Sequence, residues 1–357
     1  MKQLIATAPR QLQLLDYDDR PIEAHEVRIQ VQYASPKHGS ELADFRGLSP
    51  FIGENYDAQW QAFLPRAEGE AAGVAFGKWN VGNMVVGEIT EVGGAATGYA
   101  PGDRVCTYSG IRETAIVNAI DNHRLLKMKA GVPWQSALCY DPAQFALGGI
   151  RDGGVLPGDF VAVFGLGAIG QIAVQIAKKM GAGLVVALDP IAMRREVALQ
   201  GGADHTLDPL QDDAGLALKK LSGKTGMDVI IETSGSKEAL QAALRGLAYG
   251  GTISYVAWPK EFGAGLNLGR EAHYNNAKIV FSRVASEPLP QYPRWNRRRI
   301  EATVWKWITE GFIDGERIIH PVVPFSKAAE AYSETVDRHP EKSIKLGVAF
   351  TDAQEAN

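Results

Sequence analysis

The stretch from residue 160 to residue 189 constrains the fold of this chain more than any other part of it. A run of apolar, β-type residues at 160–164 enters the turn Gly165-Leu-Gly-Ala-Ile-Gly170, and apolar residues then recur at helical spacing. A second apolar run at 184–188 ends in the acid Asp189. A strand before the turn, a helix after it and an acid about 20 residues further on are the context in which a Gly-x-Gly-x-x-Gly sequence binds a dinucleotide.

The three glycines have separate physical roles in such a turn. Gly165 allows the tight bend from strand to helix, Gly167 lets the backbone approach a diphosphate, and Gly170 lets the helix pack closely on the strand. The free N–H groups at the start of the helix would then hold the phosphates. The candidate cofactor-binding residues of this turn are Gly165, Leu166, Gly167, Ala168, Ile169 and Gly170. An ordinary glycine turn in a parallel sheet is the alternative interpretation.

Asp189 indicates which dinucleotide would bind. Its carboxylate would accept hydrogen bonds from the ribose hydroxyls, and its charge would repel the 2′-phosphate of NADP. The sequence therefore favours NAD over NADP. Arg194, a further candidate cofactor-binding residue, follows closely and weakens this preference, because a cation nearby could accommodate that phosphate.

The rest of the chain divides into two patterns. From residue 160 to about 256, strands alternate with helical segments, which predicts an α/β fold with a doubly wound parallel sheet. The N-terminal part instead contains several short strands, which suggests a small β-barrel. Residues 48–80 lie between these strands as a long irregular stretch with six aromatic residues. Such a stretch is a lid or a wall of a substrate pocket, or else a hydrophobic cluster beneath a loop.

Composition excludes several classes of protein. The 357 residues suffice for two domains, and a net charge of −4 without a long basic run gives no reason to expect a nucleic-acid partner. No apolar run reaches the ~18 residues that a membrane span needs, so we expect no membrane association. Only two cysteines, Cys106 and Cys139, fit a reducing cytoplasm better than a disulfide scaffold.

The order of motifs resembles the medium-chain dehydrogenase/reductase family, which includes the zinc alcohol and polyol dehydrogenases. The resemblance is carried by the glycine turn together with Val86-Gly-Glu-Ile-Thr-Glu-Val-Gly93, Pro101-Gly-Asp-Arg-Val105, Asp228-Val-Ile-Ile-Glu-Thr-Ser-Gly235 and Gly250-Gly-Thr-Ile253. It implies a GroES-like β-barrel catalytic domain at 1–150, completed by 290–357, and a Rossmann NAD(P)-binding domain at 151–289. It also implies a small-molecule substrate and a homodimer or homotetramer.

The chain departs from the zinc-dependent members of that family at the ligand positions. Where those members have a cysteine, a histidine, and a cysteine or acid, this chain has His38, Asn83 and Asp141. Catalytic zinc normally takes three ligands from Cys, His, Asp and Glu, and an Asn amide is a weak, neutral ligand. The sequence therefore favours catalysis without zinc. A metal held by these three residues is the alternative.

Without zinc, side chains must take the hydroxyl proton while hydride leaves. The unperturbed pKa of a histidine side chain suits that task. A solvent-exposed histidine in a turn is an equally good interpretation of His38. By resemblance, Ser40 lies where the family relays protons through a hydroxyl, and Asp141 would orient His38 or increase its basicity.

The predicted function is an NAD(P)-dependent alcohol or polyol dehydrogenase (EC 1.1.1). It would interconvert a secondary alcohol, in a polyol or sugar derivative, and a ketone. One alternative is a zinc-free enoyl or quinone reductase of the same superfamily, which would use NADPH; Asp189 argues against it. The other is a non-catalytic nucleotide-binding protein.

Overall fold

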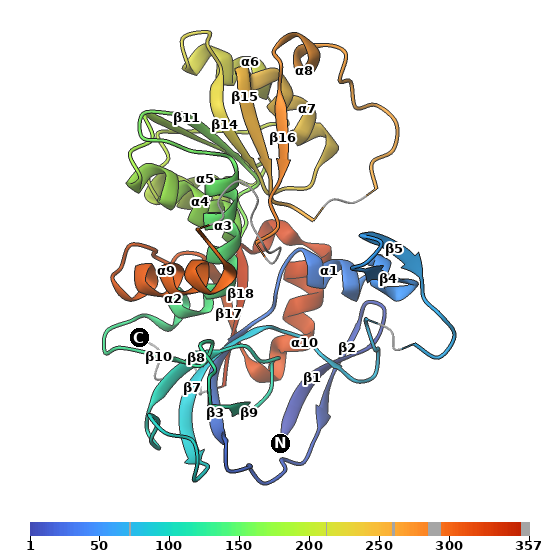
Figure 1. Cartoon of the computed structure of the whole chain (residues 1–357), viewed down its shortest axis with the longest axis vertical. Coiled ribbons are helices and arrows are strands. Elements are labelled where there is room, and N and C mark those ends of the chain that lie inside the picture. Colours follow the sequence, from blue (N-terminus) through green and yellow to red (C-terminus); the bar gives the residue numbers. More distant parts are fainter. Residues whose placement is uncertain (71–72, 212, 259–260, 285–293, 351–357) are drawn as a thin grey trace. The chain divides into compact units, whose positions relative to one another are not determined.

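The structure is a computed structural model that describes residues 1–70, 73–211, 213–258, 261–284 and 294–350 (Figure 1). Its contacts group into two units. We call Met1–Trp134, with the chain from Ile319 onward, the barrel unit, and Gln135–Ile318 the nucleotide unit. The contacts thus divide the chain near 134 and 318, whereas the motif order placed the functional boundaries at 150 and 290. Those functional boundaries stay a prediction.

The nucleotide unit is built on one parallel sheet, which confirms the predicted α/β, doubly wound fold class. Its strand order is β13 (His205–Leu207), β12 (Leu184–Leu188), β11 (Phe160–Phe164), β14 (Met227–Glu232), β15 (Leu247–Tyr255) and β16 (Lys278–Phe281). The chain moves outward from β11 to β13 and then returns to the other side of β11. The order therefore reverses between β11 and β14, and ligands of such sheets bind at the carboxyl ends of the strands beside that point.

Helices cover both faces of this sheet, because the central strands are apolar on both sides. Leu218 and Leu244 pack with Phe164 and Ile230 in one buried cluster, which places α6 and α7 on one face. On β11 the alternate residue Val163 is also fully buried, and α4 contacts β11 and β12. The helices are α2 (Trp134–Leu138), α3 (Tyr140–Asp152), α4 (Ala168–Lys179), α5 (Ala192–Gln200), α6 (Ala214–Leu221), α7 (Lys237–Gly246), α8 (Glu271–Tyr274) and α9 (Arg297–Thr309).

The barrel unit contains a largely antiparallel sheet of short strands, as the sequence pattern predicts. The strands in order are β10 (Leu126–Lys127), β8 (Arg104–Thr107), β7 (Met84–Val92), β3 (Glu26–Ser35), β18 (Lys345–Ala349) and β17 (Ile319–Pro324), and β9 (Thr114–Asn118) also pairs with β3. A smaller sheet joins β2 (Gln11–Asp16), β1 (Lys2–Ala8) and β6 (Trp79–Asn80). The position of β18 means that a strand from beyond residue 340 completes the sheet of the N-terminal segment.

Short helices complete the barrel unit. They are α1 (Ser40–Phe45), η1 (Pro50–Ile52), η2 (Phe325–Lys327), α10 (Ala328–Ala331), the π-helical η3 (Tyr332–Arg338) and η4 (Pro340–Lys342). The ring of Tyr332 meets that of Phe45 edge to face at 5.0 Å and anchors the π-helical segment in the core. No helix in the described part of the chain reaches the length and hydropathy of a membrane span.

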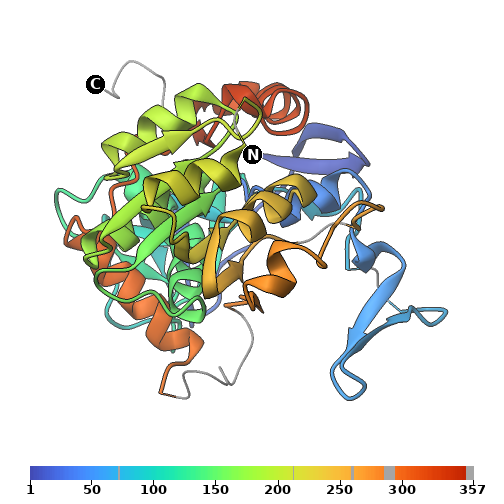
Figure 2. The same ribbon diagram turned by 90° about the horizontal axis from the view of Figure 1, so that it is seen from above.

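The stretch that the sequence suggests is irregular, residues 48–80, contains a β-hairpin of β4 (Glu54–Asp57) and β5 (Ala62–Pro65), light blue in Figure 2. The ring of Phe63 contacts Phe51 at 5.5 Å and Tyr56 at 5.4 Å between centroids. Period-2 alternation is too short here to be recognised in the sequence, so the prediction of an irregular stretch was wrong for these residues.

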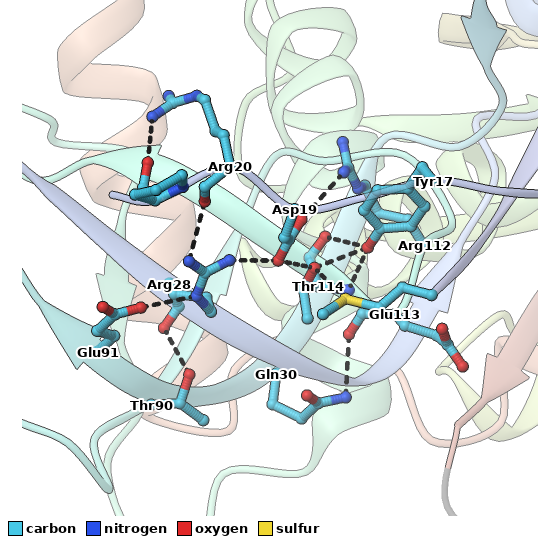
Figure 3. A network of polar contacts seen from close by, with 12 residues as sticks. Tyr17, Asp19, Arg20, Arg28, Gln30, Thr90, Glu91, Arg112, Glu113 and Thr114 are labelled. Carbon is cyan, nitrogen blue, oxygen red and sulfur yellow. Dashed lines mark hydrogen bonds and ion pairs between the residues drawn. The ribbon is translucent and has the colours of Figure 1, made fainter. Parts of the chain in front are cut away.

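A polar network fastens the connection between β2 and β3 to the sheet of the barrel unit (Figure 3). The buried carboxylate of Asp19 accepts hydrogen bonds from Arg28 and, at 2.5 Å, from the Thr114 hydroxyl. The Tyr17 hydroxyl lies 2.7 Å from the same Thr114 oxygen. Because the buried charge is paired and hydrogen-bonded on several sides, this cluster serves the fold of the unit.

Candidate active site

The glycine turn of the nucleotide unit has the geometry that its sequence predicts. Gly165 has φ +84°, and a Cβ there would lie 2.8 Å from the backbone nitrogen of Ser234. A Cβ on Gly170 would lie 1.9 Å from the carbonyl oxygen of Gly165. At Gly167, by contrast, a Cβ would meet nothing within 4 Å. The first and third glycines are therefore needed by the chain itself, and the second leaves open space beside the backbone.

That open space lies at the start of a helix. Gly167 is the N-cap of the 12-residue helix α4, and it provides no side-chain hydrogen bond to the first turn. The N–H groups at the start of a helix have no intrahelical partners and carry partial positive charge. Leu166, Ala168 and Ile169 lie in this turn, so the predicted phosphate-binding residues are brought together. They fit the diphosphate of a dinucleotide.

Asp189 has a structural role that the sequence did not indicate. It is buried at the end of β12, where its Oδ2 accepts the Leu166 N–H at 2.8 Å and its Oδ1 accepts the Ile191 N–H at 2.9 Å. Its carboxylate therefore holds the glycine turn, and each oxygen keeps a second lone pair for a ribose hydroxyl. Arg194 lies alongside, with Nη1 3.6 Å from Asp189 Oδ2.

Thr233, the residue directly after β14, supports the same turn and is not among the residues predicted from the sequence. Its hydroxyl donates to the Gly165 carbonyl oxygen at 2.7 Å. The preceding residue, Glu232, is buried, and burial raises the pKa of its carboxyl, which accepts the N–H groups of Ser234 and Gly235. The one signal that could have pointed to Thr233 is its position directly after a strand next to β11.

In the barrel unit, the turn that carries His38 is held by β18. The Leu346 N–H points at His38 Nε2 at 3.3 Å, so Nε2 is the unprotonated nitrogen in this geometry. Lys345 Nζ donates to the Pro36 carbonyl at 2.6 Å, and Ser35 Oγ donates to the Leu346 carbonyl at 2.8 Å. His38 is half-buried, and the contacts with β18 hold its turn in place.

Ser40 and Glu41 follow His38 at the start of α1. Ser40 is half-buried and Glu41 is buried. Oε2 of Glu41 accepts the Gly82 N–H at 2.9 Å. Burial raises the pKa of the Glu41 carboxyl to about 7, against the opposing effects of the backbone N–H of Gly82 and the charge of Lys345. Nothing in the local sequence indicates that Glu41 is buried.

Asn83 lies in the turn that precedes β7. Its N–H donates to the Ser35 carbonyl, and its own carbonyl accepts the Ser109 N–H, both at 3.2 Å. Its side-chain Oδ1 and Nδ2 are shielded from solvent and have no hydrogen-bond partner within the described chain. The barrel unit thus brings His38, Ser40 and Asn83 into two turns that are bonded to each other through Ser35 and Glu41.

Asp141, the remaining predicted catalytic residue, belongs to the nucleotide unit. It is buried in the first turn of α3, directly before Pro142. Its role stays a prediction.

The residues at the zinc-ligand positions fit a zinc ion poorly. Across the residues that the structure describes, no group of three His, Cys, Asp or Glu side chains converges. His38 offers one imidazole, whose Nε2 faces a backbone N–H, and Asn83 offers a neutral amide. A catalytic zinc takes three stronger ligands.

Comparison with known proteins gives consistent relatives. Residues 168–298 match the family described as zinc-binding dehydrogenase. D-guloside 3-dehydrogenase of Escherichia coli K12 is 57% identical over 350 residues, which cover 98% of this chain and 100% of that protein.

Solved structures share the fold at lower identity. An alcohol dehydrogenase from Escherichia coli CFT073, complexed with NADH, is 21% identical with a TM-score of 0.71, covering 98% of this chain and 99% of that one. A zinc-binding dehydrogenase from Sinorhizobium meliloti, bound to NADP, is 18% identical with a TM-score of 0.73, covering 98% of both chains.

Proposed function

The chain belongs to the zinc-type medium-chain dehydrogenase family, and from that membership we propose that it oxidises a secondary hydroxyl of a sugar glycoside to a ketone with NAD. The hydroxyl on carbon 3 of a guloside is the leading candidate. The observation that carries this proposal is the 57% identity, over nearly the whole chain, to a relative named for that reaction. The same relative favours a dehydrogenase over an enoyl or quinone reductase and over a non-catalytic nucleotide-binding protein.

The nucleotide unit would hold the cofactor by the turn at 165–170 and the start of α4. NAD supplies the nicotinamide ring that accepts a hydride from the carbinol carbon. Asp189 favours NAD over NADP, because a buried carboxylate already committed to the turn repels a 2′-phosphate. Arg194 lies against that carboxylate, where it balances the buried charge.

In the barrel unit, we assign His38 as the final acceptor of the proton that the substrate hydroxyl loses. As the C–H bond breaks and hydride leaves, the hydroxyl proton passes to the Ser40 oxygen while Ser40 passes its own proton to His38 Nε2. The Leu346 N–H must withdraw for this, and at 3.3 Å its hydrogen bond is long and easily broken. No step in this mechanism uses zinc.

The first experiment measures NADH formation from NAD and a panel of methyl glycosides, including the guloside and its 3-deoxy analogue. We expect turnover of the guloside and none of the 3-deoxy compound, because the latter lacks the reacting hydroxyl. Equal turnover of the two would move the reaction to another carbon. No turnover on any glycoside would overturn the proposal.

A second experiment tests the base. His38→Ala should lower kcat by about 10²–10⁴-fold, the usual contribution of a general base, and should leave NAD affinity unchanged. His25→Ala is the matched control, because His25 is a partly exposed histidine of the same unit. A His38→Ala enzyme as fast as that control would remove His38 from the mechanism.

A further inference from the structure

The side-chain amide of Asn83 lies in an environment that is unusual for a buried amide. An Asn amide can accept two hydrogen bonds at Oδ1 and donate two from Nδ2, and both atoms of Asn83 are shielded from solvent without a partner in the described chain. Buried polar groups nearly always have partners, and one that lacks them requires an explanation. Three residues earlier, Asn80 provides the contrast, since its Nδ2 donates to the Leu4 carbonyl at 2.8 Å and to the Ile111 carbonyl at 3.2 Å.

The backbone around Asn83 is fixed, so its amide is not in a loop that could relax. Both backbone polar groups of Asn83 are hydrogen-bonded. The preceding Gly82 has φ +110°, a conformation that favours glycine, and a Cβ there would lie 2.7 Å from Ile111 Cγ1. The following residue, Met84, pairs with Ser35 at the start of β7. The backbone therefore holds Asn83 in one position, and its amide has no partner in the described part of the chain.

The turn of Asn83 is joined to the turn of the proposed base. Ser35 accepts the Asn83 N–H and stands three residues before His38. Glu41, three residues after His38, accepts the N–H of Gly82 through its carboxylate. Two bonds, one on each side of His38, thus connect these segments.

We propose that Asn83 is a catalytic residue that hydrogen-bonds the hydroxyl under oxidation, donating from Nδ2 to its oxygen as negative charge develops there. This rests on the proposed function. The carbinol carbon loses a hydride to NAD, and the oxygen loses its proton to His38 through Ser40. Asn83 neither gains nor loses a proton, because an amide does not titrate in this range. Its Oδ1 remains available to accept a hydrogen bond from a neighbouring hydroxyl of the sugar.

The role suits an amide better than the other side chains nearby. A sugar hydroxyl both donates and accepts, and an amide offers both functions in one plane. A fixed donor aimed at a developing alkoxide stabilises the transition state more than the ground state, and removal of such a donor costs enzymes about 10²–10³-fold in kcat. The substrate would then provide hydrogen-bond partners for an amide that has none among the described residues.

The experiment compares Asn83→Leu with Asn80→Leu, since leucine has a similar size and no polar atom. We measure kcat and KM on the guloside, NAD affinity by calorimetry and the temperature of thermal unfolding. Asn83→Leu should lose about 100-fold or more in kcat, with little change in KM or NAD affinity, and should unfold at the wild-type temperature or above it. Asn80→Leu should unfold at a lower temperature and keep its kcat where it is folded.

A third variant, Asn83→Asp, keeps the shape of the side chain and removes the donor. It should be as slow as Asn83→Leu. An Asn83→Leu enzyme with wild-type kcat would overturn the proposal, and would point to an amide that holds a structural water. Loss of kcat together with a lower unfolding temperature would assign Asn83 to the fold and overturn it as well. If wild-type enzyme oxidises no glycoside, the proposed function itself fails and this proposal falls with it.

Discussion

Oε2 of Glu41 accepts the backbone N–H of Gly82 at 2.9 Å, and this bond ties the turn of His38 to the turn of Asn83. The carboxyl that makes it is buried, with the Lys345 ammonium and the Tyr332 hydroxyl nearby. Because burial raises its pKa to about 7, Glu41 changes its charge near neutral pH. The hydrogen bond that connects the two turns therefore depends on pH.

This pH dependence can be measured as stability. The pKa of Glu41 rises from an ordinary 4.5 to about 7 on folding, so the folded state binds the proton more tightly. Stability that is fully present below about pH 4.5 is lost as pH rises towards 7, by up to about 3 kcal/mol. Glu41→Gln keeps an oxygen for the Gly82 N–H and carries no charge. It should be more stable than wild type at pH 8 and equal to it near pH 4.5, as measured by urea unfolding.

The control for that measurement is Glu88→Gln, an exposed glutamate on β7. It should follow the wild-type pH dependence. If Glu41→Gln follows it too, the carboxyl of Glu41 does not titrate between those pH values.

Asp189→Asn tests the double role of the acid at the end of β12. The amide can accept only one of the two N–H groups, from Leu166 and Ile191, that the carboxylate now accepts. We expect NAD affinity to fall about tenfold and stability by about 1–2 kcal/mol, since one buried N–H loses its partner. The preference for NAD over NADP should shrink as well. Asp208→Asn, at an ion pair with Arg195, is the control, and equal NAD binding by both variants would contradict the assignment.

Metal analysis tests the zinc-free mechanism. The family resemblance places Asn83 where zinc-dependent members have a histidine ligand, so we expect the purified enzyme to contain much less than one zinc per chain. Dialysis against a chelator should leave kcat unchanged. Stoichiometric zinc, with activity lost on chelation and restored by zinc, would show that the family's metal chemistry persists here.

The outer edge of β16 predicts how the chain associates. In the described chain β16 is the last strand of the parallel sheet, and it exposes Ile279 and Phe281. A second copy of the chain can pair with an exposed apolar edge strand and so continue the sheet. We expect a homodimer, or a tetramer built from it, that Phe281→Lys converts to monomers by light scattering. Leu210→Lys, at an exposed leucine of the same unit, should stay associated; a wild-type monomer would exclude this interface.

The nucleotide unit was predictable because its information is local. A Cβ on Gly170 would meet the carbonyl oxygen of the nearby Gly165, and the alternation of strand and helix is visible in the sequence. The contact of Gly165 with Ser234 is the exception, because Ser234 is distant in sequence. The ribose contact of Asp189 stays a prediction, and its bond to the Leu166 N–H could not be predicted because it depends on the geometry of the turn.

The site in the barrel unit was predictable only in part. His38, Ser40 and Asn83 follow from positions in a family pattern. The contacts that hold these residues do not follow from that pattern, because Lys345 and Leu346 lie more than 300 residues away from Pro36 and His38 in sequence. A lysine in a strand is usually solvated, so nothing marked Lys345 as buried. The burial of Glu41 could not be predicted either, because a glutamate is also usually solvated.

The separation of β18 from the turn that it holds has a consequence for biosynthesis. As the ribosome proceeds, residues 1–134 emerge first but lack the strand that pairs with β3 and engages the His38 turn. The whole nucleotide unit is translated in the interval and, as a contiguous segment, is free to fold on the way. A nascent chain should therefore complete its nucleotide unit before the His38 turn is held by β18, so termination between residues 318 and 345 should yield a chain with the glycine turn but without the contacts that position His38.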